Sequence, residues 1–231
     1  MGTRTVSLLQ QLFGCLSDQQ VLDKLVQDEL LIDSNRYICP RVFCVSANVS
    51  STPQTLQLWT NYNYPPSSGL STNSYRINTA KAVRSTSAAP AYFTAVNLDN
   101  CRYADGAIIA NNPTDIAMRE ARKLFNEDIE LILSIGTGIY KADSPTYEWF
   151  DIVGHIIVAS TDTERVHEII EYFHGQDKYV RLNPPLNTSI SIDAKEPEKL
   201  AILKHIGKEY VTQYANDHPK EIERLAKILR N

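Results

Sequence analysis

The chain has 231 residues, of which 43% are hydrophobic and 22% charged, and its formal net charge is −4 at pH 7. These values are typical of a globular protein long enough to bury one large core. The negative charge offers no electrostatic basis for binding nucleic acid, and no apolar run approaches the roughly 20 residues of a membrane-spanning helix. The N-terminus carries no secretory signal pattern. We therefore expect the four cysteines to be buried thiols in a reducing compartment; they are Cys15, Cys39, Cys44 and Cys101.

Apolar periodicity in the first half of the chain predicts helices, followed by strands. Helices are expected over 6–13 and 18–31, a buried strand over 40–49, a strand of alternating character over 55–61, and a loop over 65–69. A further helix is expected after Asn78, which would cap it, and this helix would continue toward Ala89 and end at Pro90.

The second half predicts strands that alternate with helices, which is typical of an α/β layered sheet. The expected strands cover 102–104, 129–135 and 178–182, and the expected helices cover 114–125, 147–173 and the region from Pro197 to the end, with a break at Pro219.

The most informative stretch runs from Tyr103 to Pro113 and places one carboxylate, Asp105, at the end of a short apolar strand. We expect Gly106 to turn the backbone with positive φ, and Asn112 and Pro113 to occupy the N-cap and first position of a helix. The position between the end of a strand and a tight turn is where α/β folds place catalytic groups. The structural alternative is a turn aspartate whose side chain accepts a backbone N–H.

A catalytic aspartate needs a nucleophile as its partner, and the 231 residues contain no Gly-x-Ser-x-Gly elbow. Ser85, Ser87 and Ser134 are the candidates for a replacement, but none lies between glycines, so we interpret them as helix or strand-end hydroxyls. Arg84 precedes two of them on the same predicted helix. The sequence leaves open whether Arg84 is a buried ion-pair partner or faces an anionic head group.

Three further patterns are weaker. Asn111-Asn112-Pro113 is explained by helix capping alone. Gly136-Thr137-Gly138 follows a strand and could cradle a phosphate, but it lacks the Gly-Lys-Ser/Thr ending of a nucleotide loop, so we favour a tight turn at the edge of an active site. His167, Glu171 and His174 share one helical face without forming an H-E-x-x-H motif, which favours a solvated polar face over a metal site.

Four segments occur in the order found in one known family: 82–93, 105–113, 133–138 and 161–167. With them, the chain resembles the C-terminal part of a patatin-like phospholipase domain, nearest to the calcium-independent phospholipase branch. The resemblance covers the chain from about Ser17 into the last helix. It implies an α/β fold, with a mostly parallel sheet and flanking helices, that is incomplete at its N-terminal side. It further implies a partial patatin-like domain over residues 1–195 and a C-terminal helical tail over 196–231.

Members of this family hydrolyse acyl esters of phospholipids and other lipids with a Ser-Asp dyad and need neither cofactor nor metal. The resemblance assigns the catalytic acid to Asp105 within Asp105-Gly106-Ala107. The family's serine elbow and its Gly-rich oxyanion loop precede the region that this chain covers. The resemblance therefore implies the acid-bearing part of a lipid acyl hydrolase, inactive by itself for lack of the nucleophile.

The alternative is a non-catalytic chain, truncated or derived from an enzyme, that binds lipid or a full-length partner. In either case the expected partner is a phospholipid or another lipid ester, with peripheral contact to a membrane. The expected location is intracellular, either cytoplasmic or peripheral on a membrane. Oligomeric state leaves no signal in the sequence.

Overall fold

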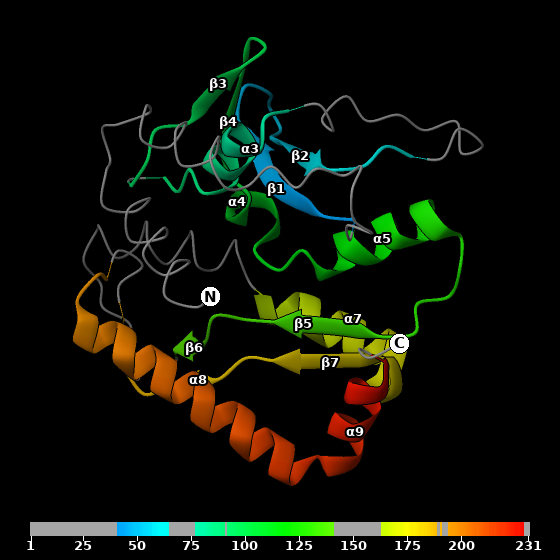
Figure 1. The fold of residues 1–231 in the computed structure, drawn as a ribbon. Helices are drawn as coiled ribbons and strands as arrows, with labels where there is room; N and C mark the ends of the chain where they lie inside the picture. Colours follow the sequence, from blue (N-terminus) through cyan, green and yellow to red (C-terminus); the bar gives the residue numbers. More distant parts are fainter. Residues whose placement is uncertain are drawn as a thin grey trace. The chain divides into compact units, whose positions relative to one another are not determined.

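The computed structural model describes residues 41–64, 77–90, 92–140, 163–188, 190 and 194–228 (Figure 1). The chain divides into two compact units: unit 1 comprises 1–127 and 149–166, and unit 2 comprises 128–148 and 167–231. The helices expected over 6–13 and 18–31, the loop over 65–69 and most of the helix expected over 147–173 lie outside the described residues. The domain division at residue 195 stays a prediction.

Unit 1 contains a four-stranded sheet in the order β2-β1-β4-β3. Its strands are β1 (Phe43–Asn48), β2 (Thr55–Thr60), β3 (Val96–Leu98) and β4 (Cys101–Asp105). Every neighbouring pair in this sheet is antiparallel, so the expected predominance of parallel pairing does not extend to it. For two of the three pairs the reason is the connection, because the short turns between β1 and β2 and between β3 and β4 can join only antiparallel neighbours.

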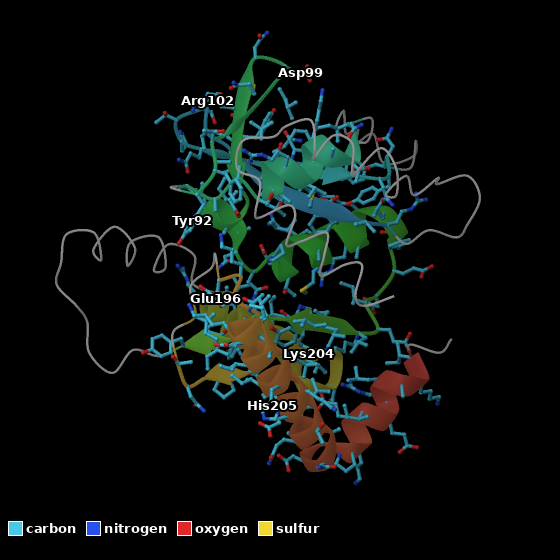
Figure 2. All side chains as sticks on the ribbon, turned by 60° about the vertical axis from the view of Figure 1, so that its left-hand side comes forward. Tyr92, Asp99, Arg102, Glu196, Lys204 and His205 are labelled. Atoms are coloured by element: carbon cyan, nitrogen blue, oxygen red, sulfur yellow. The ribbon has the colours of Figure 1, made fainter. Side chains whose placement is uncertain are left out.

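The strands expected over 40–49, 55–61 and 102–104 are confirmed as β1, β2 and β4, with slightly different ends. Strand β3 was not expected. It is joined to β4 by Asp99 and Asn100, which both have positive φ, as the two central residues of a tight hairpin require. Figure 2 shows Asp99 at the tip of this hairpin. The Asp-Asn pair lies between two triplets that alternate apolar and polar residues, Val-Asn-Leu and Cys-Arg-Tyr, and this pattern is the sequence signal that identifies such a turn.

The core of unit 1 lies between the sheet and helix α3 (Thr79–Thr86). The predicted cap is confirmed, since Asn78 Oδ1 accepts a 2.8 Å hydrogen bond from Ala80 N. The Trp59 and Tyr103 rings meet edge to face with centroids 4.9 Å apart, and Ala82 of α3 packs against them. Helix α3 is thereby held against β1 and β4, the strand that ends in Asp105.

Two helices follow β4: the short α4 (Ala107–Ala110) and α5 (Thr114–Phe125). The expected bounds of α5 are confirmed, but its start differs in detail. Pro113, not Asn112, occupies the N-cap, because α4 ends at Ala110 and only a three-residue turn separates the two helices. Asn112 Oδ1 still accepts hydrogen bonds from the backbone N and hydroxyl of Thr114, at 3.3 and 2.5 Å.

Helix α5 also buries a carboxylate. Glu120 is only 2% exposed, and its Oε2 accepts hydrogen bonds from the hydroxyls of Tyr62 and Tyr64 at 2.9 and 2.7 Å. Lys123 Nζ donates to the other oxygen, Oε1, at 2.8 Å. This network ties α5 to the segment that follows β2.

Unit 2 contains two parallel strand pairs. Strand β5 (Ile132–Ile135) pairs with β7 (Tyr179–Leu182), and β6 (Ile139–Tyr140) pairs with β8 (Pro185–Leu186). The strand expected over 129–135 begins only at Ile132. The strand expected over 178–182 begins at Tyr179, because Lys178 is the last residue of the preceding helix. The two short strands β6 and β8 were not expected.

Helix α7 (Thr163–Lys178) precedes β7 and extends past the expected end at residue 173. Gly175 interrupts it with φ 63° and ψ 174°. The C-terminal helix is confirmed with its break, as α8 (Pro197–Asp217) and α9 (Pro219–Ile228). Figure 2 shows Glu196 just before α8 and Lys204 and His205 on it.

The mixture of sheets with flanking helices confirms the α/β class. Among the helices of the described residues, none combines the length and the apolar character needed to cross a bilayer.

Candidate active site

Asp105 lies at the end of β4, opposite Ser46 of the neighbouring strand β1. The strand leaves the sheet immediately afterwards, since Gly106 begins the turn into α4. The carboxylate is partly buried. The predicted position of the carboxylate, between a strand and a tight turn, is thus confirmed.

The three successive N–H groups at this turn all have acceptors. Asp105 N donates to Ala88 O at 3.0 Å, and Gly106 N donates to Thr86 O at 3.4 Å. Ala107 N donates at 2.8 Å to Oδ1 of Asp105 itself. The last bond is the backbone contact expected of a turn aspartate. It occupies one carboxylate oxygen; among the described residues, no hydrogen-bond donor contacts the other, Oδ2.

The prediction of positive φ at Gly106 is wrong. The residue has φ −62° and ψ −24°, which any amino acid adopts easily. The requirement for glycine is steric, because a Cβ at this position would lie 2.2 Å from the carbonyl oxygen of Val45. The close approach of the turn to β1 explains the Asp-Gly sequence, and it could not be read from a conformational preference.

Burial raises the pKa of the Asp105 carboxyl, and the hydrogen bond from Ala107 N opposes this effect. A carboxylate that is partly desolvated is a stronger base than one in water. One free oxygen and a raised pKa are the properties that a general base for a hydroxyl nucleophile needs.

The structure brings the first and second of the four family segments together around Asp105 in unit 1. Residues 86–88 of the first segment supply the carbonyls that accept the N–H groups of Asp105 and Gly106. Thr86 is the residue that sequence reasoning missed. Its Oγ1 donates to Val45 O, which connects the end of α3 to β1. No motif signals this role, because it depends on a strand about 40 residues earlier in the chain.

Among the described residues, Arg84 forms no ion pair, and the alternative of an anionic head group stays a prediction. Its Nη2 donates to Thr94 O at 3.0 Å, and its guanidinium lies 5.2 Å from the centroid of the Phe93 ring. Its Nη1 is buried and has no hydrogen-bond partner among the described residues. Burial lowers the pKa of this guanidinium. Arg84 therefore holds the segment between Pro90 and β3 against α3.

The three serines considered as replacement nucleophiles are engaged in other bonds. Ser85 Oγ donates to Lys81 O at 2.7 Å and Ser87 Oγ to Val83 O at 2.8 Å, both within α3. Ser134 Oγ accepts a hydrogen bond of 2.9 Å from Arg181. These contacts fit the interpretation as helix and strand hydroxyls.

The turn Gly136-Thr137-Gly138 lies in unit 2, between β5 and β6. Gly138 N donates to Asn183 Oδ1 at 2.8 Å, and Gly136 N donates to Leu182 O at 2.8 Å. A Cβ on Gly136 would lie 2.3 Å from Asn183 Oδ1. The glycines thus allow the turn to close on the Asn183 side chain, as expected of a tight turn.

The remaining candidates have structural contacts. Asn112 Nδ2 donates to Thr163 O at 2.9 Å, which connects the second family segment to the start of α7 within unit 1. His167 Nδ1 lies 3.1 Å from the Tyr179 hydroxyl, and its Nε2 lies 3.9 Å from Glu171. In the part of the chain that the structure describes, no three His, Cys, Asp or Glu side chains are placed to hold a metal ion.

A match to a known family covers the residues that surround Asp105 in unit 1. The family model described as "Patatin-like phospholipase" matches residues 6–118, a range that includes both the α3 segment and Asp105-Gly106-Ala107. The chain belongs to the patatin-like phospholipase family. The resemblance seen in the sequence is thereby confirmed.

The similar curated proteins include calcium-independent phospholipases. The chain is 32% identical over 238 residues to calcium-independent phospholipase A2-gamma of Oryctolagus cuniculus and 31% identical over 242 residues to that of Homo sapiens. It is 30% identical over 205 residues, 72% of its length, to phospholipase A I of Arabidopsis thaliana, of which it covers 16%. The two A2-gamma alignments cover 99% of this chain but only 30% of each relative. The chain therefore spans under a third of these relatives.

Proposed function

We propose that this chain is the acid-bearing part of a patatin-like lipid acyl hydrolase, with Asp105 as the general base of a Ser-Asp dyad. The serine would come from a Gly-x-Ser-x-Gly elbow, which these 231 residues do not contain. The observation that carries the proposal is the geometry at Asp105. One carboxylate oxygen is fixed by Ala107 N, and the other has no donor among the described residues.

In this mechanism Asp105 Oδ2 accepts the proton of the serine hydroxyl as the serine oxygen attacks the ester carbonyl. The same carboxyl then returns the proton to the leaving alcohol. Burial supports the first step, because it raises the pKa of Asp105 and makes the carboxylate a stronger base. The bond from Ala107 N keeps the side chain in one orientation throughout.

The proposed substrates are phospholipids or other lipid esters. Support comes from the family and from relatives whose names describe them as phospholipases. We also infer peripheral contact with a membrane, because that is where such substrates reside. An intracellular location, cytoplasmic or peripheral on a membrane, is supported by Cys44 and Cys101, which are both free thiols.

The test compares Asp105→Asn with a matched control, Asp99→Asn, in a polypeptide that joins these residues to a serine elbow of the family. Asp99 is exposed at the β3–β4 hairpin tip (Figure 2) and makes the same change of charge. We expect Asp105→Asn to lower the rate of phospholipid hydrolysis by about 10²–10⁴ and Asp99→Asn to leave it unchanged. A folded Asp105→Asn variant with normal hydrolysis would assign the residue to turn structure alone.

The second candidate is a non-catalytic chain that binds lipid or a full-length partner. It is favoured by the lack of the elbow within the 231 residues. Both candidates predict that the purified chain alone does not hydrolyse esters or react with a fluorophosphonate probe. They differ once the elbow is supplied, since only the dyad proposal predicts that hydrolysis then depends on Asp105.

A further inference from the structure

The Thr86 side chain forms its hydrogen bond outside its own helix. Its Oγ1 donates to the carbonyl oxygen of Val45 in β1. The hydroxyls on either side, those of Ser85 and Ser87, instead donate back to carbonyls of α3. Thr86 therefore links the last turn of α3 to the strand that lies beside Asp105.

The Val45 carbonyl needs this donor because β4 ends beside it. In an antiparallel ladder, the N–H and C=O of one residue point toward the same neighbour, and alternate residues share that direction. Val49 N donates to Arg102 O in β4, so Val45, four residues earlier, also faces the β4 side. The last pair of the β1–β4 ladder is Ser46 with Asp105. Beyond this pair β4 offers no backbone N–H to the Val45 carbonyl, and the Thr86 hydroxyl donates to it instead.

The same segment of chain holds the Asp105 turn. The carbonyl of Thr86 accepts from Gly106 N, and that of Ala88 accepts from Asp105 N. Any movement of residues 86–88 away from β1 would displace the two carbonyl oxygens that accept hydrogen bonds from the backbone N–H groups of Asp105 and Gly106.

We infer that Thr86 is a positioning residue of the Asp105 site, and that its hydroxyl holds residues 86–88 against β1 so that their carbonyls fix the Asp105 turn. The consequence for catalysis rests on the proposed function of Asp105, whereas the positioning itself does not. The inference therefore has a test that requires no enzymatic activity.

The elements packed around Asp105 carry few charges. They are Lys81 and Arg84 on α3 and Arg102 on β4, whereas β1 and α4 contain none. The pKa of Asp105 is raised by burial and lowered by Ala107 N, with no contribution from these cations. Loosening of the turn should therefore be seen as a fall of the Asp105 pKa toward its ordinary value, because water would then reach the carboxylate.

The experiment uses the full chain and three variants. Thr86→Val removes the hydroxyl at nearly constant shape, and Thr86→Ser keeps it. The matched control is Ser87→Ala, which removes a hydroxyl at the same helix end whose hydrogen bond goes to Val83 O within α3. Amide hydrogen exchange is measured for Asp105 and Gly106 and compared with the β1–β2 ladder, and the Asp105 carboxyl is titrated by carbon NMR.

In Thr86→Val we expect exchange at residues 105 and 106 to be about fivefold to tenfold faster, with the β1–β2 amides unchanged and the Asp105 pKa lower. Thr86→Ser and Ser87→Ala should resemble the unmodified chain. An equal acceleration in the β1–β2 ladder, or a Thr86→Ser variant that behaves like Thr86→Val, would overturn the inference in favour of general packing. Unchanged exchange in Thr86→Val would also overturn it. None of these outcomes depends on whether Asp105 acts as a base.

Discussion

Replacing Gly106 by alanine tests the steric explanation of the Asp-Gly turn. The added Cβ would lie 2.2 Å from Val45 O and 2.7 Å from its carbonyl carbon, and both are backbone atoms that cannot rotate away. An ordinary C···O contact is about 3.3 Å or longer, so the turn and β1 must separate by roughly 1 Å.

That separation breaks one of two hydrogen bonds: Gly106 N to Thr86 O if Thr86 stays with β1, or Thr86 Oγ1 to Val45 O if it moves with the turn. Either loss leaves one donor and one acceptor without a partner. Each buried group left without a partner costs about 1–3 kcal/mol. We therefore expect Gly106→Ala to lower the free energy of unfolding of unit 1 by about 2–5 kcal/mol. This is a large share of the roughly 5–15 kcal/mol that stabilises a typical domain.

Two other glycines provide controls. Gly207 lies within α8, and a Cβ there would meet nothing within 4 Å, so Gly207→Ala should stabilise by roughly 0.5–1 kcal/mol through helix propensity. Gly175 is equally open but has φ 63° and ψ 174°, a conformation almost confined to glycine, so Gly175→Ala should cost about 1–3 kcal/mol from backbone conformation alone.

The assay is urea unfolding followed by tryptophan fluorescence, to which Trp59 in the core of unit 1 contributes, and by circular dichroism. A Gly106→Ala variant within about 0.5 kcal/mol of the unmodified chain, at unchanged urea dependence, would refute the steric argument. It would show that β1 and the turn separate at little cost.

Three other substitutions test electrostatics and turn geometry. Burial makes the Asp105 pKa higher in the folded chain than in the unfolded one, so ionisation of Asp105 opposes folding. The Asp105→Asn variant should therefore be more stable than the unmodified chain at pH 7. Urea unfolding should show that this gain in stability disappears below the ordinary pKa of 3.8. Glu120→Gln should lose about 1–3 kcal/mol at pH 7, because an amide cannot accept from all three donors. Burial alone would raise the pKa of Glu120, but hydrogen bonds from Lys123 and two tyrosines lower it, so this loss should shrink as the pH falls through the folded pKa. A loss that did not shrink even where the folded carboxylate is protonated would contradict this explanation. Asn183→Ala should speed amide hydrogen exchange at Gly138 by about tenfold and leave exchange in other turns unchanged, because it removes the acceptor of Gly138 N. An unchanged exchange rate at Gly138 would show that the glycines close the turn without the Asn183 side chain.

Local patterns were sufficient for much of the fold. Asn78 was recognised as a cap because its side chain bonds a backbone group two residues away, and the bounds of α5 follow from its own periodicity. The position of Asp105 at a strand end was equally local, and four ordered motifs identified the family. In each case the interactions that decide the structure join residues close together in sequence.

Contacts between distant segments were decided by the tertiary structure. The antiparallel sheet depends on how β1 pairs with β4, more than 50 residues later in the chain. Gly106 was correctly selected as a turn residue but for the wrong reason, because its constraint is the carbonyl of Val45 and not its own φ. Thr86 had no sequence signal, since its hydroxyl acts on a strand 41 positions away. The sequence motifs identified the family and selected Asp105 as the candidate catalytic residue, whereas the groups that hold Asp105 in place became evident only in the folded chain, because they come from segments distant in sequence.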